Sequence, residues 1–223
     1  MHQHRAKYAQ WLGETNDITR MFLAASQIPD MINMAGGLPE SSVYPTEDLA
    51  RIAQDAIADH PGDALDYGPI EGLPALRQLI ADRFSNDDLN LTMENVLVTS
   101  GGMQGLDLIG KALLDQDDVI ACQSPSYLGA LDAWRPRQPQ YRPFYPEAMD
   151  FNGFQSLEGA KFAYTVPNFS NPTGKLIDTA TRQSLAEASE QTGTWLVEDD
   201  PYGTLYYDSK PLPRILSLSA DDT

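Results

Sequence analysis

The sequence predicts an α/β fold in three layers, with a mostly parallel sheet covered by helices on both faces. Two observations lead to this prediction. From about residue 96 onwards, short apolar runs of strand length alternate with longer helical patterns. Hydrophobic residues make up 42% of the 223 residues and charged residues 21%, which is typical of a globular chain with a buried core. Collagen-like, coiled-coil and mainly disordered classes are therefore excluded.

The part before the alternation is less regular. In order, we expect a helical arm over 4–28, a short strand over 31–37, a helix from Thr46 to about Pro61, a loop over 65–72 and a helix over 76–84. Thr46 marks a helix start because the acidic Glu47 and Asp48 that follow it favour the first turn. We expect residues 1–45 to be an arm with a small-domain segment, and 46–223 to be a large domain.

The alternating part supplies the predicted sheet. The apolar runs expected as strands are 96–99, 119–122, 141–145, 162–165 and 195–198. The helices expected between them are 103–114, 126–134 and 178–192. Asp178 or Thr179 can cap the start of the last helix, and Gly193 can end it.

Charge and composition narrow the function classes. The chain has 15 Lys plus Arg against 32 Asp plus Glu, a net charge of −17, which disfavours nucleic-acid and membrane partners. Its single cysteine, Cys122, cannot form an internal disulfide, so we expect a reducing, cytoplasmic location. Three histidines are too few for a zinc site, and no metal is expected. We see neither a signal peptide nor an apolar run of membrane-spanning length.

Polar clusters follow three of the predicted strands, at 100–104, 168–174 and 198–202. In open parallel sheets, ligands bind beyond the carboxyl ends of the strands, so these clusters should converge. The first is a glycine turn entering a helix, whose free N–H groups suit a phosphate. Its glycines, at 101, 102 and 105, do not fit a dinucleotide fingerprint. Taken singly, the first cluster could be only a tight turn, the second only residues that favour turns, and the third only acids exposed to solvent.

Together, these clusters and several further motifs resemble a known family. The matching pieces are Ala35-Gly36-Gly37-Leu38-Pro39, Tyr67-Gly68-Pro69, Glu71-Gly72, Leu76-Arg77, Pro125-Ser126-Tyr127, Asn171-Pro172-Thr173-Gly174 and Glu198-Asp199-Asp200-Pro201-Tyr202-Gly203. The pieces occur in the same order as in fold-type I, pyridoxal-phosphate-dependent aminotransferases of class I/II, and the chain resembles the N-terminal and central part of these enzymes. The 2-aminoadipate-type and broad-specificity enzymes are the most similar.

The resemblance implies a site for pyridoxal 5′-phosphate (PLP). The phosphate would lie at Gly102 and Met103, with Gln104 nearby. Tyr127 would stack on the pyridine ring, since a flat ring suits another flat ring. Asp199 would face the pyridine nitrogen and keep it protonated, so that the ring accepts electrons.

The remaining implied roles concern the cofactor oxygen, the substrate and a second subunit. Asn171 and Tyr202 would donate hydrogen bonds to the phenolic oxygen of the cofactor. Tyr67 would reach the phosphate of the neighbouring subunit, which implies a homodimer with composite sites. Gly37 would line the substrate carboxylate pocket. Arg20 would help select the substrate side chain, or is simply a solvated helix arginine.

One part of the family pattern has no match. The lysines are at positions 7, 111, 161, 175 and 210, and none stands a few dozen residues beyond Asp199, where the family has its Schiff-base lysine. No catalytic residue is therefore assigned. We expect a fragment with an incomplete large domain and without the C-terminal small domain, inactive on its own.

The expected function is transfer of an amino group between an amino acid and a 2-oxo acid. A lyase or decarboxylase of the same fold is the first alternative. The aminotransferase-like sensor half of a transcription regulator is the second, and it would need a basic DNA-binding domain ahead of the arm. An inert fold is disfavoured because Asp199, Asn171, Tyr202 and Tyr127 occur together. The sequence does not identify the amino donor.

Overall fold

The computed structural model describes residues 7–13, 21, 24, 28, 30, 32, 39–86 and 89–219. Most of the predicted arm and the strand at 31–37 lie outside these residues, as do Arg20 and Gly37. The chain divides into two compact units, Met1–Pro69 and Ile70–Thr223, and each is described by itself.

The first unit contains short helices. They are η1 (Gln10–Gly13), η2 (Ser41–Val43), α2 (Thr46–Asp59) and α3 (Pro61–Leu65). The predicted helix from Thr46 is present as α2. The unpredicted α3 begins at a proline, whose fixed φ and missing N–H suit a first helical position. Within this unit, α2 and α3 contact each other. The predicted domain boundary after residue 45 stays a prediction.

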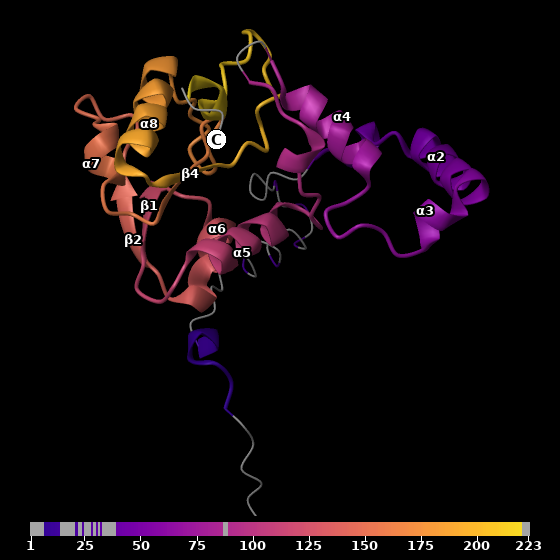
Figure 1. The fold of residues 1–223 in the computed structure, drawn as a ribbon, viewed down its shortest axis with the longest axis horizontal. Helices are drawn as coiled ribbons and strands as arrows, with labels where there is room; N and C mark the ends of the chain where they lie inside the picture. The colour runs from indigo at the N-terminus through magenta and orange to yellow at the C-terminus, as the bar shows by residue number, and fades with distance from the viewer. Residues whose placement is uncertain are drawn as a thin grey trace, which may run out of the picture. The chain divides into compact units, whose positions relative to one another are not determined.

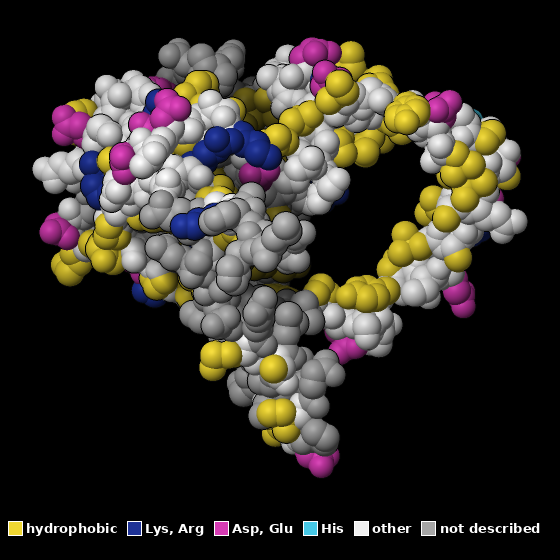
Figure 2. All heavy atoms as spheres, turned by 90° about the horizontal axis from the view of Figure 1, so that it is seen from below, with side chains coloured by type: hydrophobic (Ala, Val, Ile, Leu, Met, Phe, Trp, Pro, Cys, Tyr) yellow, Lys and Arg dark blue, Asp and Glu magenta, His cyan; other side chains and the backbone are white. Residues whose placement is uncertain are grey.

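The apolar side of α2 is uncovered within the first unit. Leu49, Ile52 and Ile57 are 57%, 54% and 51% exposed, and no residue of α2 is buried. Figure 2 shows apolar side chains on the surface of the described residues. A helix with this pattern ordinarily buries its apolar side against another element.

The second unit holds the sheet (Figure 1). Its elements are α4 (Pro74–Phe84), η3 (Met93–Asn95), α5 (Gly102–Leu113), β1 (Val119–Gln123), α6 (Leu128–Trp134), η4 (Arg135–Arg137), β2 (Gln140–Phe144), α7 (Gly153–Leu157), β3 (Phe162–Thr165), α8 (Thr179–Thr192), β4 (Trp195–Glu198) and η5 (Ile215–Leu218). The strands form one four-stranded sheet in the order β2-β1-β3-β4, and every pairing is parallel.

Helices cover both faces of the sheet, which confirms the predicted fold class. On one face, Trp134 and Leu106 of α6 and α5 pack with alternate residues of β1 and β3, including Tyr164. On the other face, Leu157 of α7 and Leu185 of α8 pack with the intervening strand residues. Because successive strand residues point to opposite faces, each strand contributes to both cores.

One sequence prediction for this unit is wrong, and one short α-helix was not predicted. Residues 96–99 pair with no strand among the described residues; instead, the Val98 N–H donates to the Glu71 oxygen at 2.9 Å. An apolar run makes a strand only if a neighbouring strand accepts its hydrogen bonds. The short α7 was not predicted. It begins because the Asn152 side chain accepts from the Gln155 N–H at 2.9 Å.

A close contact between α5 and α6 gives a stability prediction. A Cβ at Gly110 would lie 2.6 Å from Cδ1 of Trp134, whose Nε1 is bonded to the Leu106 oxygen and whose side chain is fully buried. We expect Gly110→Ala to lower the free energy of unfolding by about 1–3 kcal/mol in urea titrations, because the ring cannot move aside.

Gly105, in the same helix, is the matched control. A Cβ there meets only Thr99 Oγ1, at 3.9 Å. Gly105→Ala should therefore stabilise the fold by up to about 1 kcal/mol, as alanine does in a helix interior. Equal stabilities for the two variants would contradict the packing described here.

Candidate cofactor site

Asp199 lies at the carboxyl end of β4, on the face covered by α5 and α6. The register pairs Tyr164 with Val197, and Asp199 comes two residues later, so all three side chains share that face. The Asp199 N–H extends the ladder to the Thr165 oxygen at 2.9 Å. Its Oδ2 accepts a hydrogen bond from the Tyr164 hydroxyl at 2.8 Å. The fold thus fixes both the backbone and the side chain of Asp199.

The two neighbouring acids have other partners. Glu198 accepts from the N–H groups of Ile215 and Leu216 in η5, at 3.1 and 3.3 Å. Asp200 accepts from Asn168 Nδ2 at 2.6 Å and pairs with Arg214 Nε at 3.4 Å. Neither acid is simply solvated, as acids at a strand end usually are. Both hold the chain segment that follows β4.

The electrostatic environment of Asp199 is unfavourable for its charge. Burial raises the pKa of its carboxyl group above the ordinary value, the hydrogen bond from Tyr164 lowers it, and the charge of Asp200 raises it further. Among the ion pairs of the residues that the structure describes, none includes Asp199. A partly buried carboxylate without a cation is costly, so this site favours a positively charged ligand atom.

The start of α5 offers free backbone donors. Gly101 precedes the helix with φ 96°, a conformation that favours glycine. The Ser100 N–H donates to Gln104 Oε1 at 2.5 Å, so Gln104 supports the turn. The N–H groups of Gly102 and Met103 have no acceptor within the helix. A Cβ at Gly101 or Gly102 would meet nothing within 4 Å. The helix start is therefore an open, exposed place for an anion.

Two tyrosines pack on the side of the sheet that carries Asp199. Tyr127, which precedes α6, and Tyr202, which follows β4, both pack in part against the core that contains Tyr164. The Tyr127 hydroxyl is 3.9 Å from the sulfur of Met103. A Cβ at Gly129 would come within 2.4 Å of Tyr127 Cζ, so the glycine makes room for this ring. The structure thus brings Gly102, Met103, Tyr127, Asp199 and Tyr202 to one face.

The structure leaves the roles of four other predicted site residues untested. Asn171 is exposed, in the loop between β3 and α8. Tyr67 is fully exposed and belongs to the first unit. Arg20 and Gly37 lie outside the described residues. For these four residues, the roles implied by the resemblance stay predictions.

Sequence reasoning missed the buried polar network beneath the site. Arg182 of α8 is 0% exposed and donates to the oxygens of Ile177, Pro167 and Pro213, at 2.8, 3.1 and 2.9 Å. It also donates to Asn168 Oδ1 at 2.8 Å. Because Asn168 bonds Asp200, this network joins the loop after β3, α8 and the segment after β4. In the sequence, Arg182 looks like any solvated helix arginine.

The lysines are occupied elsewhere or exposed. Lys111 pairs with Asp107, Lys161 with Asp118 and Lys175 with Glu147. Lys7 and Lys210 are exposed. None of the contacts within the described part of the chain joins a lysine to Asp199, Tyr127 or Tyr202.

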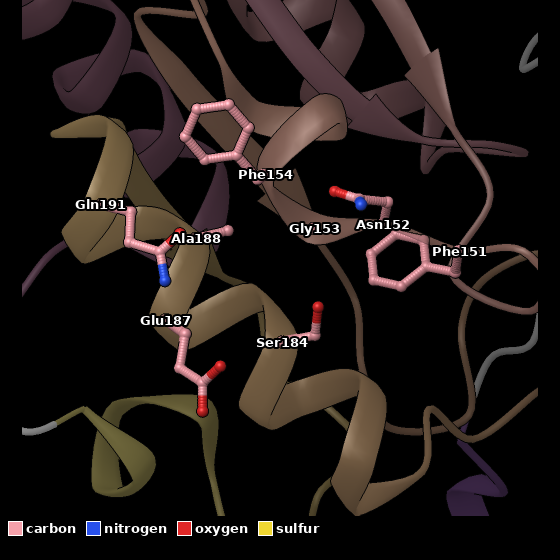
Figure 3. A pocket seen from close by; sticks show the side chains of 8 residues that line it. All are labelled: Phe151, Asn152, Gly153, Phe154, Ser184, Glu187, Ala188 and Gln191. Carbon is pink, nitrogen blue, oxygen red and sulfur yellow. The ribbon is translucent and has the colours of Figure 1, made fainter.

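A separate hollow lies on the opposite side of the sheet (Figure 3). It has a volume of about 160 Å³, between α7 and α8, and is lined by residues such as Phe151, Ser184 and Gln191. Since α7 and α8 cover the face away from Asp199, it is not part of the site. No group of His, Cys, Asp and Glu in the described ranges could hold a metal, and no helix there could span a membrane.

The sequence of residues 29–223 matches the family described as aminotransferase class I and II. The chain belongs to this family. Similar curated proteins include a 2-aminoadipate transaminase from Thermus thermophilus, 33% identical over 91% of this chain and 51% of that protein. An aromatic-amino-acid aminotransferase from Thermococcus litoralis is 33% identical over 92% of this chain and 52% of that protein. The chain spans about half the length of the curated relatives it matches.

Solved structures of the family have the same fold. LysN, an alpha-aminoadipate aminotransferase from Thermus thermophilus in complex with N-(5′-phosphopyridoxyl)-L-leucine, gives a TM-score of 0.82 at 31% identity, over 95% of this chain and 53% of that one. A kynurenine aminotransferase from Pyrococcus horikoshii, in complex with PMP, gives a TM-score of 0.82 at 29% identity, over 96% of this chain and 56% of that one. These matches confirm the family identified from the motifs.

Proposed function

We propose that this chain forms the PLP-binding part of an aminotransferase that moves an amino group between an amino acid and a 2-oxo acid. The observation that carries the proposal is the Asp199 carboxylate, which is partly buried, held by Tyr164 and has no cationic partner among the described residues. A protonated ring nitrogen is the kind of group that such a carboxylate would bind.

The residues present fit this cofactor. PLP combines a phosphate, a flat aromatic ring and a basic ring nitrogen. The start of α5 offers two free N–H groups and open space, which suit the phosphate. Tyr127 and Tyr202 offer aromatic surface. Asp199 offers the negative charge, and the three kinds of group share one face of the sheet.

Each residue then has a distinct task. When bound, PLP supplies an electron sink for the amino acid's α-carbon. Asp199 would hold a proton at the ring nitrogen, which makes the sink stronger. Gly102 and Met103 would bind the phosphate through their N–H groups, and Tyr127 would orient the ring. Asn171 and Tyr202 are proposed as donors to the ring oxygen, on the resemblance alone.

A homodimer and an amino-acid substrate complete the proposal. Tyr67 and the apolar side of α2 are exposed within the first unit, as is expected of residues that contact a partner subunit. Gly37 and Arg20 are proposed to contact the substrate, on the resemblance alone. Cys122 is the chain's single cysteine and is buried, so we keep a reducing, cytoplasmic compartment as part of the proposal.

A regulator is the second candidate, because proteins named as transcriptional regulators also match. One is the HTH-type regulator YisV of Bacillus subtilis, 29% identical over 82% of this chain and 38% of that protein. The transaminases match at higher identity and over more of their own length, which favours the enzyme.

The proposal is tested on the full-length gene product. Purified protein is titrated with PLP, and each amino acid is then supplied with 2-oxoglutarate while the new 2-oxo acid is quantified by mass spectrometry. We expect saturable PLP binding and conversion of at least one amino acid to its 2-oxo acid. An amine or an eliminated side chain as product would indicate the decarboxylase or lyase. Binding without turnover would favour the regulator, and no PLP binding would contradict both.

A further inference from the structure

Tyr164 is a buried phenol next to the proposed cofactor site, and the resemblance gives it no role. It is 0% exposed, on β3, one residue before the strand ends. Its hydroxyl donates to Oδ2 of Asp199 at 2.8 Å. No contact within the described part of the chain engages the other carboxylate oxygen. The bond thus selects one orientation of the carboxylate.

The Tyr164 ring is itself held in place. Trp134 packs edge-on against it, with ring centroids 5.1 Å apart and planes at 80°. The Trp134 indole is anchored in turn by its Nε1 donating to the Leu106 oxygen at 2.8 Å. A fully buried ring between a fixed indole and the sheet cannot change rotamer freely. The hydroxyl therefore stays aimed at Asp199.

The surroundings of this pair keep the Tyr164 phenol protonated, so it remains a hydrogen-bond donor. Burial, and then the nearby Asp199 charge, raise the pKa of the Tyr164 phenol, so it stays protonated. Cys122 and Tyr127 also face it, and their charges would act in the same direction. For Asp199, burial and Asp200 raise the carboxyl pKa, and the Tyr164 bond is what opposes them. Removing that bond should therefore disfavour the ionised form of Asp199 relative to the protonated form.

We propose that Tyr164 is a positioning residue that acts through Asp199, orienting its carboxylate and supporting its charge for the cofactor's ring nitrogen. This inference rests on the proposed function. Tyr164 need not touch the cofactor, because its effect passes through one hydrogen bond. A residue that only filled the core would not alter how Asp199 titrates.

The test compares Tyr164→Phe with Tyr141→Phe in the full-length gene product. Tyr141 is the matched control: its hydroxyl also donates one hydrogen bond, to the Leu131 oxygen at 2.9 Å, but it lies on β2, separated from β3 by β1. The Asp199 carboxyl is followed by ¹³C NMR in cofactor-free protein, and its signal is assigned by its loss in Asp199→Asn. PLP dissociation constants are measured on the same samples.

We expect Tyr164→Phe to raise the Asp199 titration midpoint by about one pH unit, the effect of one hydrogen bond to a charged group. PLP should bind about fivefold more weakly at the wild-type midpoint, and the difference should approach about tenfold below it, because fewer Asp199 carboxyl groups are ionised. Tyr141→Phe should change neither quantity. An unchanged midpoint in folded Tyr164→Phe would overturn the proposal.

A second substitution keeps the test decisive if Tyr164→Phe does not fold. Site-specific 3-fluorotyrosine at position 164 retains the hydroxyl and makes it a more acidic donor, so the Asp199 midpoint should fall below the wild-type value. No fall would also overturn the proposal. Failure of the wild-type protein to bind PLP would instead contradict the proposed function, since the midpoints are measured without cofactor.

Discussion

Replacing Asp199 with asparagine is expected to lower the turnover of the full-length gene product by about 10²–10³-fold, the usual cost of losing one preorganised electrostatic contact. The amide can still accept from Tyr164, but it cannot hold a proton at the ring nitrogen. PLP should still bind, because the phosphate contacts at Gly102 and Met103 are local to the α5 start. The measurement is kcat for amino transfer, with PLP occupancy determined on the same sample.

The same variant should not be unfolded at neutral pH. Burial raises the pKa of Asp199 in the folded state, so the native protein binds this proton more tightly than the unfolded chain. Its contribution to stability is therefore greatest at low pH and is lost as the pH rises through the folded pKa. Asparagine carries no charge to desolvate, so above that pKa the cofactor-free variant should be as stable as wild type, or more so.

Asp200→Asn is the matched control for Asp199→Asn. It removes a carboxylate one residue away that bonds Asn168 and pairs with Arg214. We expect reduced stability in urea but turnover within a few-fold of wild type. The reverse pattern, with Asp199→Asn nearly normal and Asp200→Asn inactive, would move the ring-nitrogen role to Asp200.

The second large effect is expected for Arg182→Met. The side chain is fully buried, and its loss leaves the backbone oxygens of Ile177 and Pro213 without their Arg182 donor. The oxygens of Pro167 and Asn168 each lose one of two donors, since the Ile177 N–H and the Tyr206 hydroxyl still bond them. We expect the free energy of unfolding to fall by about 3–5 kcal/mol, because buried acceptors would be left without donors. Urea unfolding followed by circular dichroism measures this.

Lys111→Met is the control for this loss of charge. Lys111 pairs with Asp107 one turn away on α5, and the side chains of both are substantially exposed. Its removal should cost less than about 0.5 kcal/mol, as for other surface pairs on helices. If Arg182→Met were as mild, the network under the site would not hold the loops together.

The sequence was a good guide wherever local pattern decides the structure. Short apolar runs became β1, β3 and β4 because each had a neighbouring strand, whereas 96–99 has none among the described residues. Alternation along β4 already separated Asp199 from Glu198 and Asp200, and the partners of these acids agree with that separation.

Long-range partners were beyond the sequence. Arg182 donates hydrogen bonds to the oxygens of Pro167 and Pro213, which lie far apart in the sequence. The mixed polarity of its helix does not indicate that this arginine is buried. Tyr164 looked like one more apolar strand residue, although its hydroxyl reaches Asp199, 35 positions along the chain. Such contacts depend on how β3, β4 and α8 come together, which only the folded structure shows.

A crystal structure of the full-length gene product with PLP tests the central claim most directly. We predict the phosphate within hydrogen-bonding reach of the N–H groups of Gly102 and Met103, the ring against Tyr127, and the ring nitrogen facing the Asp199 carboxylate. A phosphate bound away from the start of α5, or a ring nitrogen facing Asp200 while Asp199 contacts only Tyr164, would contradict the account.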